Sequence, residues 1–178
     1  FQMNNTTTIC ALASALGQGG IGVVRVSGPQ STEIAQKMLG HVPKARYAHY
    51  GSFFNQKGVE IDKGVALFFP GPHSFTGEDV IEFQGHGGIL VMRSLLESAM
   101  ALGAVAAEPG EFSKRAFING KMDLVQAEAV ADIIDASSEQ SARSALRSLS
   151  GEFSDQVNAL TKALIELRVF VEATDRKS

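Results

Sequence analysis

A change in composition at Lys121 constrains the fold of this chain more than any other feature. Glycine and proline are frequent before that point, whereas only Gly151 and no proline follow it. Residues that favour helices, such as alanine, leucine, glutamate and arginine, dominate the rest. We therefore expect two domains, one over residues 3–119 and a helical one over residues 120–178.

Strands and helices interleave in the first part, and hairpins occur as well. Strands are expected from apolar and β-branched runs at residues 7–15, 23–26, 46–54, 59–69, 80–83 and 104–107. Helices are expected at residues 31–39, 89–102 and 112–119. The fully apolar run Val65–Phe69 predicts a strand that is covered on both faces. This pattern indicates an α/β fold of the α+β kind, in which helices pack on a mixed β-sheet.

One apolar stripe runs along most of the second part, which predicts a long-helix bundle segment. Its members lie three or four residues apart: Ala142, Leu146, Leu149, Phe153, Val157, Leu160, Leu164, Leu167 and Val171. Gly151 interrupts this continuous stripe at a cost of about 1 kcal/mol relative to alanine. Asp123 and either Ser137 or Ser138 are suited to begin the preceding helices. A single amphipathic helix cannot bury its own stripe, so it must pack on the α/β part, on a second copy or on helices outside this chain.

The segment Pro70–Gly88, PGPHSFTGEDVIEFQGHGG, predicts a turn, a short strand and a glycine-rich exit into a helix. Such an exit can turn backbone N–H groups toward an anion or a polar ring. Glu82 lies within the strand, where a carboxylate is costly without a partner. Glu82 is therefore either paired inside the protein or available to a ligand.

The glycines at Gly17–Gly22, GQGGIG, match the dinucleotide fingerprint G-x-G-x-x-G, which requires a helix after it. The run Val23–Val26 has strand character instead, so we interpret the glycines as a connection between two strands. A dinucleotide site is the minor alternative. Arg25 lies in this run. The commoner interpretation is an arginine that points outward to solvent. The functional interpretation is a guanidinium that points at a carboxylate or a ring oxygen.

Several self-contained catalytic sites are absent from the sequence. The four histidines lie in different local settings and Cys10 is the only cysteine, so neither a metal site nor a disulfide framework is expected. Met122 follows Gly120 and Lys121 where a Walker A loop needs serine or threonine. The net charge of −3 provides no overall attraction to nucleic acid. No apolar run reaches the roughly 20 residues of a membrane span.

Three long segments of the chain resemble the tRNA-modification GTPase family MnmE, also called TrmE. They are GQGGIGVVRVSG, FFPGPHSFTGEDVIEFQGHGG and PGEFSKRAFINGKMDLVQAEAVADIIDASSEQSARSAL, and the similarity extends from about Thr7 to Thr174. The resemblance implies a folate-binding, dimerising α/β domain followed by the first part of a helical domain. The family's GTP-binding domain is not among the matching segments, so this fragment is not expected to hydrolyse GTP. Residues Asp175–Ser178 depart from the family pattern.

The resemblance also implies a function for the full-length protein. Family members act as homodimers with the flavoprotein MnmG on the wobble uridine of tRNA, where they build a carboxymethylaminomethyl-type group at the uracil C5. The one-carbon donor is 5-formyl- or methylene-tetrahydrofolate, and GTP hydrolysis with Mg²⁺ and K⁺ drives the cycle. A cytoplasmic protein without membrane contact is implied.

The resemblance places the folate contacts at Arg25, Glu82 and Lys121. Gly85, His86 and Gly87 form a secondary set that we expect to shape the pocket floor. A pterin presents an N–H and an amino group side by side, which one carboxylate such as Glu82 can accept. Either Arg25 or Lys121 suits the anionic p-aminobenzoyl-glutamate tail.

Two further points remain open in the sequence. Phe75 and Phe117 could stack on a ring, although packing in the core is the commoner role. The alternative to folate binding is a pure protein-assembly module without a ligand, which predicts that Glu82 has no folate to bind.

Overall fold

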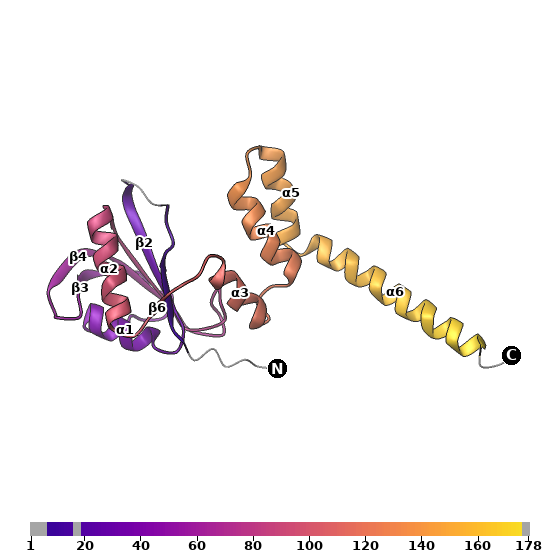
Figure 1. The fold of residues 1–178 in the computed structure, drawn as a ribbon, viewed down its shortest axis with the longest axis horizontal. Coiled ribbons are helices and arrows are strands. Elements are labelled where there is room, and N and C mark those ends of the chain that lie inside the picture. The colour runs from indigo at the N-terminus through magenta and orange to yellow at the C-terminus, as the bar shows by residue number, and fades with distance from the viewer. Residues whose placement is uncertain (1–6, 16–18, 176–178) are drawn as a thin grey trace. The chain divides into compact units, whose positions relative to one another are not determined.

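The computed structural model describes residues 7–15 and 19–175 and divides the chain into two units. The first unit ends at Lys121 and the second begins at Met122. Among the described residues, the strands belong to the first unit and the second is helical (Figure 1). This architecture confirms the predicted α/β fold followed by a helical segment.

The first unit is built on one mixed sheet. Its strands are β1 (Ile9–Leu12), β2 (Gly19–Ser27), β3 (His49–Phe54), β4 (Glu60–Phe69), β5 (Val80–Gly87) and β6 (Val105–Ala106). Its helices are α1 (Ser31–Leu39), α2 (Ile89–Ala101) and α3 (Glu111–Ile118). The strand order is β3-β4-β5-β2-β1-β6, in which β1 and β6 are parallel and the other neighbours antiparallel.

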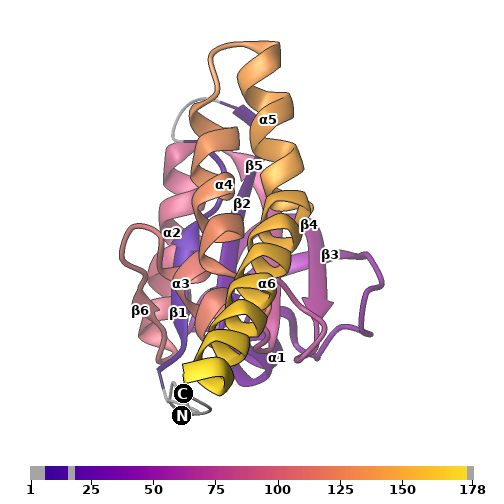
Figure 2. The same cartoon turned by 90° about the vertical axis from the view of Figure 1, so that its right-hand side faces the viewer.

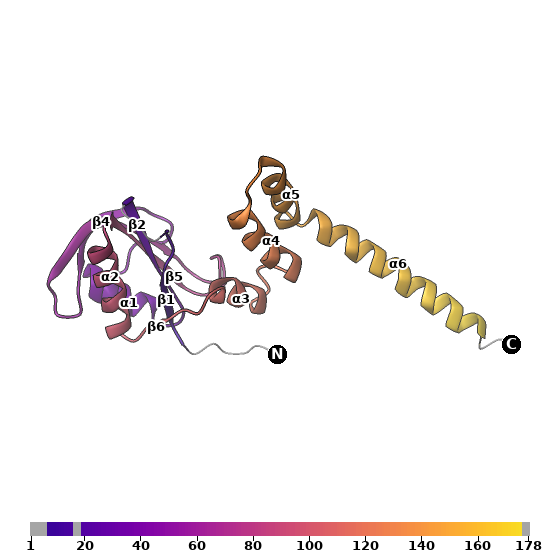
Figure 3. The same ribbon diagram turned by 45° about the horizontal axis from the view of Figure 1, so that its top comes forward.

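Helices α1 and α2 cover one face of this sheet (Figures 1 and 3). Because side chains alternate along a strand, Val24 and Val26 of β2 and Ile81 and Phe83 of β5 point to that face, where all four are fully buried. Phe83 meets Phe53 of β3 edge to face, with ring centroids 5.6 Å apart. The core of the unit therefore lies between the sheet and these two helices.

The opposite face of the sheet is more open. Within the apolar run Val65–Phe69, Ala66 on the helix-covered face is buried, whereas the other four residues are half-buried. The prediction that this strand is covered on both faces is wrong, because α1 and α2 both pack on the side of Ala66. The open face is therefore available for polar side chains.

The glycine-rich segment that matches the dinucleotide fingerprint leads into a strand. Gly17 and Gln18 lie outside the described residues, but β2 extends from Gly19 to Ser27. A dinucleotide site requires a helix N-terminus at this place. The structure therefore excludes the dinucleotide alternative.

The second unit consists of α4 (Leu124–Asp135), α5 (Glu139–Leu149) and α6 (Glu152–Asp175) in its described part. Helices α4 and α5 form an antiparallel hairpin (Figure 2). As predicted, Asp123 begins α4 by accepting a hydrogen bond from the Gln126 backbone N–H. Ser138 begins α5 in the same way. No described helix is long and apolar enough to cross a membrane.

The apolar stripe predicted as continuous is divided between two helices. Helix α5 ends at Leu149, and Gly151 has a φ of 90° before α6 begins at Glu152. This left-handed conformation ends a helix and is accessible to glycine at little steric cost. Gly151 therefore separates two helices rather than weakening one.

Candidate functional site

Arg25 and Glu82 form an ion pair across β2 and β5. The two residues are direct neighbours in the antiparallel register. Arg25 donates from Nε to Glu82 Oε1 at 2.9 Å, and its Nη2 lies 2.8 Å from the same oxygen. Their side chains are 27% and 15% exposed and lie on the sheet face opposite α1 and α2. The structure thus pairs Glu82 inside the protein while leaving the pair partly accessible.

Two aromatic rings flank the Arg25 guanidinium. Its Cζ lies 5.6 Å from the ring centroid of Phe75 and 5.6 Å from that of Phe112. Such cation–π contacts hold a guanidinium in place while leaving its N–H groups free to donate. Phe75 is 38% exposed and Phe117 is 46% exposed. Neither ring is therefore packed in the core, which is the commoner role for a phenylalanine. Phe112 is the ring that the sequence analysis missed.

Lys121 is an exposed residue that lies beside the loop carrying Phe75. Its backbone N–H donates to the Ala116 carbonyl at 2.8 Å, which closes the end of α3. A Cβ added to Gly77 would lie 3.2 Å from Lys121 Cγ, so the lysine stem passes this glycine closely. Arg25 and Glu82 are therefore in direct contact, and Lys121 is connected to them through the segment Phe75–Gly77.

His86 is paired with Asp62 of β4 instead of with Glu82. The His86 backbone N–H donates to Asp62 Oδ2 at 2.8 Å, and the ring Nδ1 lies 2.8 Å from Oδ1. Burial raises the pKa of the Asp62 carboxyl, but the hydrogen bonds from His86 outweigh this and hold its pKa below the ordinary value. The His86 side chain is 75% exposed, so its other ring nitrogen is open to solvent.

Gly85 and Gly87 lie within β5 and not in the exit turn that we expected. A Cβ on Gly85 would lie 2.5 Å from Asp62 Oδ2, and one on Gly87 would lie 2.3 Å from the Gly19 carbonyl oxygen. The nearby Gly19 backbone therefore requires glycine at Gly87, whereas a larger residue at Gly85 would displace the Asp62 carboxylate. Gly88 follows as the residue before α2.

A buried ion-pair network beside the site was also missed from sequence. Arg115 of α3 is 4% exposed, and its Nη1 lies 3.2 Å from both carboxylate oxygens of Glu78. Its Nη2 lies 3.1 Å from Glu111 Oε1. Burial raises the pKa of Glu111, but hydrogen bonds from the Glu108 backbone and from Arg115 lower it overall. The four-residue spacing of Glu111 and Arg115 is the one sequence signal that could have found part of this network.

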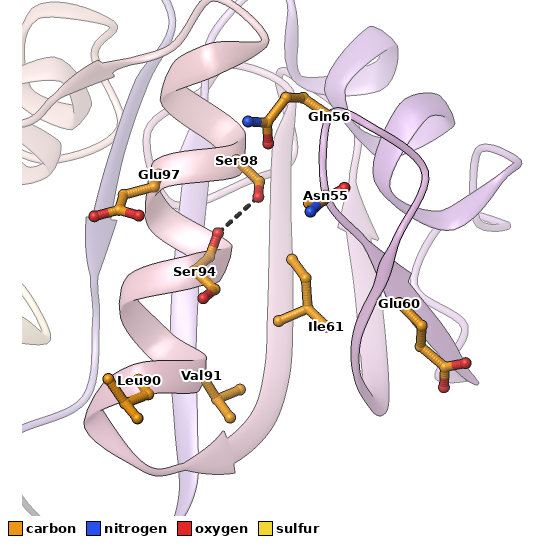
Figure 4. Close-up of a pocket in the computed structure, with 9 residues that line it drawn as sticks. All are labelled: Asn55, Gln56, Glu60, Ile61, Leu90, Val91, Ser94, Glu97 and Ser98. Carbon is orange, nitrogen blue, oxygen red and sulfur yellow. Dashed lines mark hydrogen bonds between the residues drawn. The ribbon is translucent and has the colours of Figure 1, made fainter.

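The cavity drawn in Figure 4 lies away from the predicted folate residues. It measures about 430 Å³ and is lined by Asn55, Gln56, Glu60, Ile61, Leu90, Val91, Ser94, Glu97 and Ser98. Its lining offers carboxylate, amide, hydroxyl and aliphatic groups but no basic side chain. An anionic ligand such as folate therefore finds no counter-charge there.

A second cavity of about 650 Å³ is more apolar. Its lining is Leu12, Ser14, Ala15, Gly87, Ile89, Met92, Arg93 and Leu96. Gly87 is the one predicted site residue among them, and neither Glu82 nor Lys121 takes part. This cavity therefore borders the end of β5 and does not include the Arg25–Glu82 pair.

The described residues contain no group of three or more potential metal ligands. The sequence analysis expected His41 and His49 to lie in separate settings. This prediction is wrong, because their rings are in contact, with centroids 4.2 Å apart. Cys10 is fully buried, and this burial raises its pKa to about 11, so the thiol is poorly suited to act as a nucleophile.

The chain is thus a mixed-sheet α/β domain with a charged pair on its open sheet face, joined to a helical segment. The family model described as "GTP-binding protein TrmE N-terminus" matches residues 8–121, and the one described as "MnmE helical domain" matches residues 124–174. The chain therefore belongs to the MnmE (TrmE) family.

Individual relatives carry the name tRNA modification GTPase MnmE. The protein of Ruthia magnifica subsp. Calyptogena magnifica is 72% identical over 97% of this chain and 39% of its own length. That of Hydrogenovibrio crunogenus is 63% identical over 93% of this chain and 37% of its own length. That of Pseudomonas aeruginosa is 60% identical over 94% and 37%, respectively. The chain therefore spans less than two fifths of the length of these relatives.

Proposed function

We propose that this chain is the folate-binding, dimer-forming N-terminal part of a tRNA-modifying GTPase. The observation that carries the proposal is the partly exposed Arg25–Glu82 pair on the sheet face that α1 and α2 leave open. Membership of the MnmE family supports it. The ligand is a tetrahydrofolate derivative, in the 5-formyl or methylene form.

The geometry supports a distinct role for each of the three main residues. Both Arg25 contacts converge on Glu82 Oε1, which leaves Oε2 outside the pair. Glu82 accepts the N–H and amino groups of the pterin, while Arg25 holds the carboxylate in a fixed orientation. Lys121 is then the base that meets the anionic tail, since its side chain is exposed and lies beside the same loop. Gly85, His86 and Gly87 border the pocket further along β5.

The proposal is tested by calorimetric titration of this chain with 5-formyltetrahydrofolate. We expect micromolar binding that Glu82→Gln weakens by about tenfold or more, the scale of a lost charge-assisted hydrogen bond. Arg25→Ala should weaken it as well, because Glu82 then loses its orienting partner. Lys121→Ala should weaken the binding of 5-formyltetrahydrofolate more than it weakens the binding of a folate with a shortened glutamate tail.

A matched control uses another ion pair of the same unit. Arg93 and Glu97 form an exposed pair on α2 at 3.4 Å. Glu97→Gln and Arg93→Ala should leave the affinity unchanged within twofold. Absence of heat from a folded sample, or equal binding by the Glu82 variant, would contradict folate binding at this place.

We propose that two copies associate through the α/β unit. Tyr50 on the edge strand β3 is 71% exposed and Tyr47 just before it is 64% exposed. Exposed tyrosines are enriched at protein interfaces. Sedimentation should show a dimer at tens of micromolar, and a chain that is monomeric under these conditions would refute this part.

The full-length protein is proposed to act in the cytoplasm with a flavoprotein of the MnmG type on the wobble uridine of tRNA. GTP, Mg²⁺ and K⁺ belong to its GTP-binding domain, so this chain alone should not hydrolyse GTP. In the full-length enzyme Glu82→Gln should abolish the modification, measured by nucleoside mass spectrometry, while GTP hydrolysis continues. Loss of both activities together would point to misfolding instead.

A second candidate function is a pure assembly module. It is favoured by the exposed apolar side chains of α6, among them Leu160 at 61% and Leu164 at 56%. In that case the chain dimerises normally, folate produces no heat, and Glu82→Gln changes nothing.

A further inference from the structure

The buried network around Arg115 reaches the sheet through Ser27. Ser27 is the last residue of β2 and is fully buried, and its Oγ donates to Glu78 Oε2 at 2.7 Å. Glu78 in turn lies against the Arg115 guanidinium. One carboxylate thus connects the end of β2 to α3.

The loop that precedes β5 is held by further contacts to the same two elements. Thr76 is fully buried, and its Oγ1 lies 2.7 Å from Ser27 Oγ. Its carbonyl accepts a hydrogen bond of 2.7 Å from the side chain of Asn119 at the end of α3. Arg115 also donates to the Thr7 carbonyl at 2.7 Å. The loop, β2 and α3 are therefore locked together.

Three members of this network are near neighbours in sequence of the groups around Arg25. Ser27 follows Arg25 by two positions on the same face of β2, and Thr76 is adjacent to Phe75. Arg115 follows Phe112 by three positions, which places both on one side of α3. Arg25, Phe75 and Phe112 thus each lie within three positions in sequence of a residue that the network holds in place.

From this arrangement we propose that Glu78 and Arg115 are positioning residues for the folate site. Their ion pair holds the loop and α3 so that Phe75 and Phe112 stay against Arg25, and Arg25 in turn orients Glu82. The inference rests on the proposed folate function and deepens it. Neither residue needs to touch the ligand.

The type of contact supports a positioning role. A buried ion pair adds little stability over a well-packed apolar pair, and in several proteins it selects one arrangement instead. The planar fork of arginine fixes the directions of two carboxylates at once, which a lysine cannot do. Here the fork holds Glu78 through Nη1 and Glu111 through Nη2.

The test begins with Glu78→Gln and Arg115→Lys in this chain, titrated with 5-formyltetrahydrofolate. Glutamine keeps the shape of Glu78 and lysine keeps the charge of Arg115, so at least one variant should remain folded by circular dichroism. We expect each folded variant to bind about tenfold more weakly. Glu97→Gln, which breaks the exposed pair on α2, is the control and should bind normally.

A double-mutant cycle separates positioning from general stability. If the network acts through Phe75, Glu78→Gln should cost less than twofold once Phe75→Leu is present. A purely structural network would lower the melting temperature in both backgrounds without this dependence. Equal tenfold losses in both backgrounds, or no loss in either, would overturn the inference.

A ligand-free readout keeps this result separate from that of the folate proposal. The Arg25 Nε–H resonance, assigned by its loss in Arg25→Lys, should shift and exchange faster with water in Glu78→Gln. The Arg93 resonance should stay in place. Unchanged Arg25 resonances would refute the positioning role, whereas shifted resonances without any folate binding would refute the folate function alone.

Discussion

The α/β unit and the helical unit differ in how far their large apolar side chains are buried. In the α/β unit Phe53 and Phe83 are fully buried between the sheet and its helices. In the helical unit Phe153 is 52% exposed and Leu160 is 61% exposed. The first unit therefore completes a core from its own residues. The second presents a stripe that gains its full stabilisation only when something else covers it.

Truncation of one phenylalanine in each unit should give the largest difference in the free energy of unfolding. Phe53→Ala removes a buried ring and should lower the free energy of unfolding by about 3–5 kcal/mol, whereas Phe153→Ala should cost less than about 1 kcal/mol. Both tyrosines of the chain, Tyr47 and Tyr50, lie in the α/β unit. Tyrosine fluorescence in urea therefore reports that unit, and circular dichroism at 222 nm reports mainly the helices. Similar losses for the two variants would contradict the comparison.

The junction between α5 and α6 should be the next most sensitive point. Gly151→Ala places a side chain at a φ of 90°, with only the Gln126 side-chain nitrogen near the new Cβ, at 3.7 Å. The space is sufficient, so the cost is conformational and about 1–2 kcal/mol. Circular dichroism in urea measures it. The exposed Gly58 at a φ of 77° in the β3–β4 turn is the matched position, where Gly58→Ala should shift the tyrosine transition, which Gly151→Ala should leave in place.

Loss of a helix cap should have a smaller effect that is confined to the helical unit. Ser138→Ala removes the acceptor of the Ser141 N–H at the start of α5 and should cost about 1 kcal/mol. The 222 nm transition should move to lower urea while the tyrosine transition stays in place. Ser138→Asp should restore it, since aspartate caps as well as serine.

The smallest predicted effect is a pH dependence within the α/β unit. The pKa of Asp62 in the folded protein lies below 3.8, the ordinary value for an aspartate. Its stabilising contribution is therefore complete above that value and is lost as pH falls through the folded pKa. The stability gap between the wild type and Asp62→Asn, followed by tyrosine fluorescence, should shrink as pH falls from 5 to 3. A gap that widens on acidification would contradict the assigned hydrogen bonds.

Sequence reasoning succeeded where the determining signals were local. Helix α1 follows from its apolar spacing and from the glycine, Gly40, that comes directly after its last residue, and α4 follows from the cap at Asp123. It was incomplete at Gly151, because a glycine among helix-favouring residues indicates a cost but not whether the helix breaks. It also ended β5 too early, since the need for glycine at Gly87 comes from the distant Gly19.

The candidate site shows the same division between local and distant signals. Glu82 could be singled out from sequence because a carboxylate within an apolar strand needs a partner. Its partner Arg25 is 57 positions away, and only the register of β2 and β5 brings them together. Glu78 and Arg115 are 37 positions apart and were missed for that reason. Neither separation leaves a periodic trace in one sequence.

The direct opposition of Arg25 and Glu82 also bears on how β2 and β5 find each other during folding. A slip by one residue would turn Arg25 toward the layer of α1 and α2, where Val24 and Val26 now lie. A bare guanidinium there would be far more costly than a misplaced valine, so misaligned sheets would be rejected early. The pair that we assign to ligand binding would thus also help to select the correct register of β2 and β5 during folding.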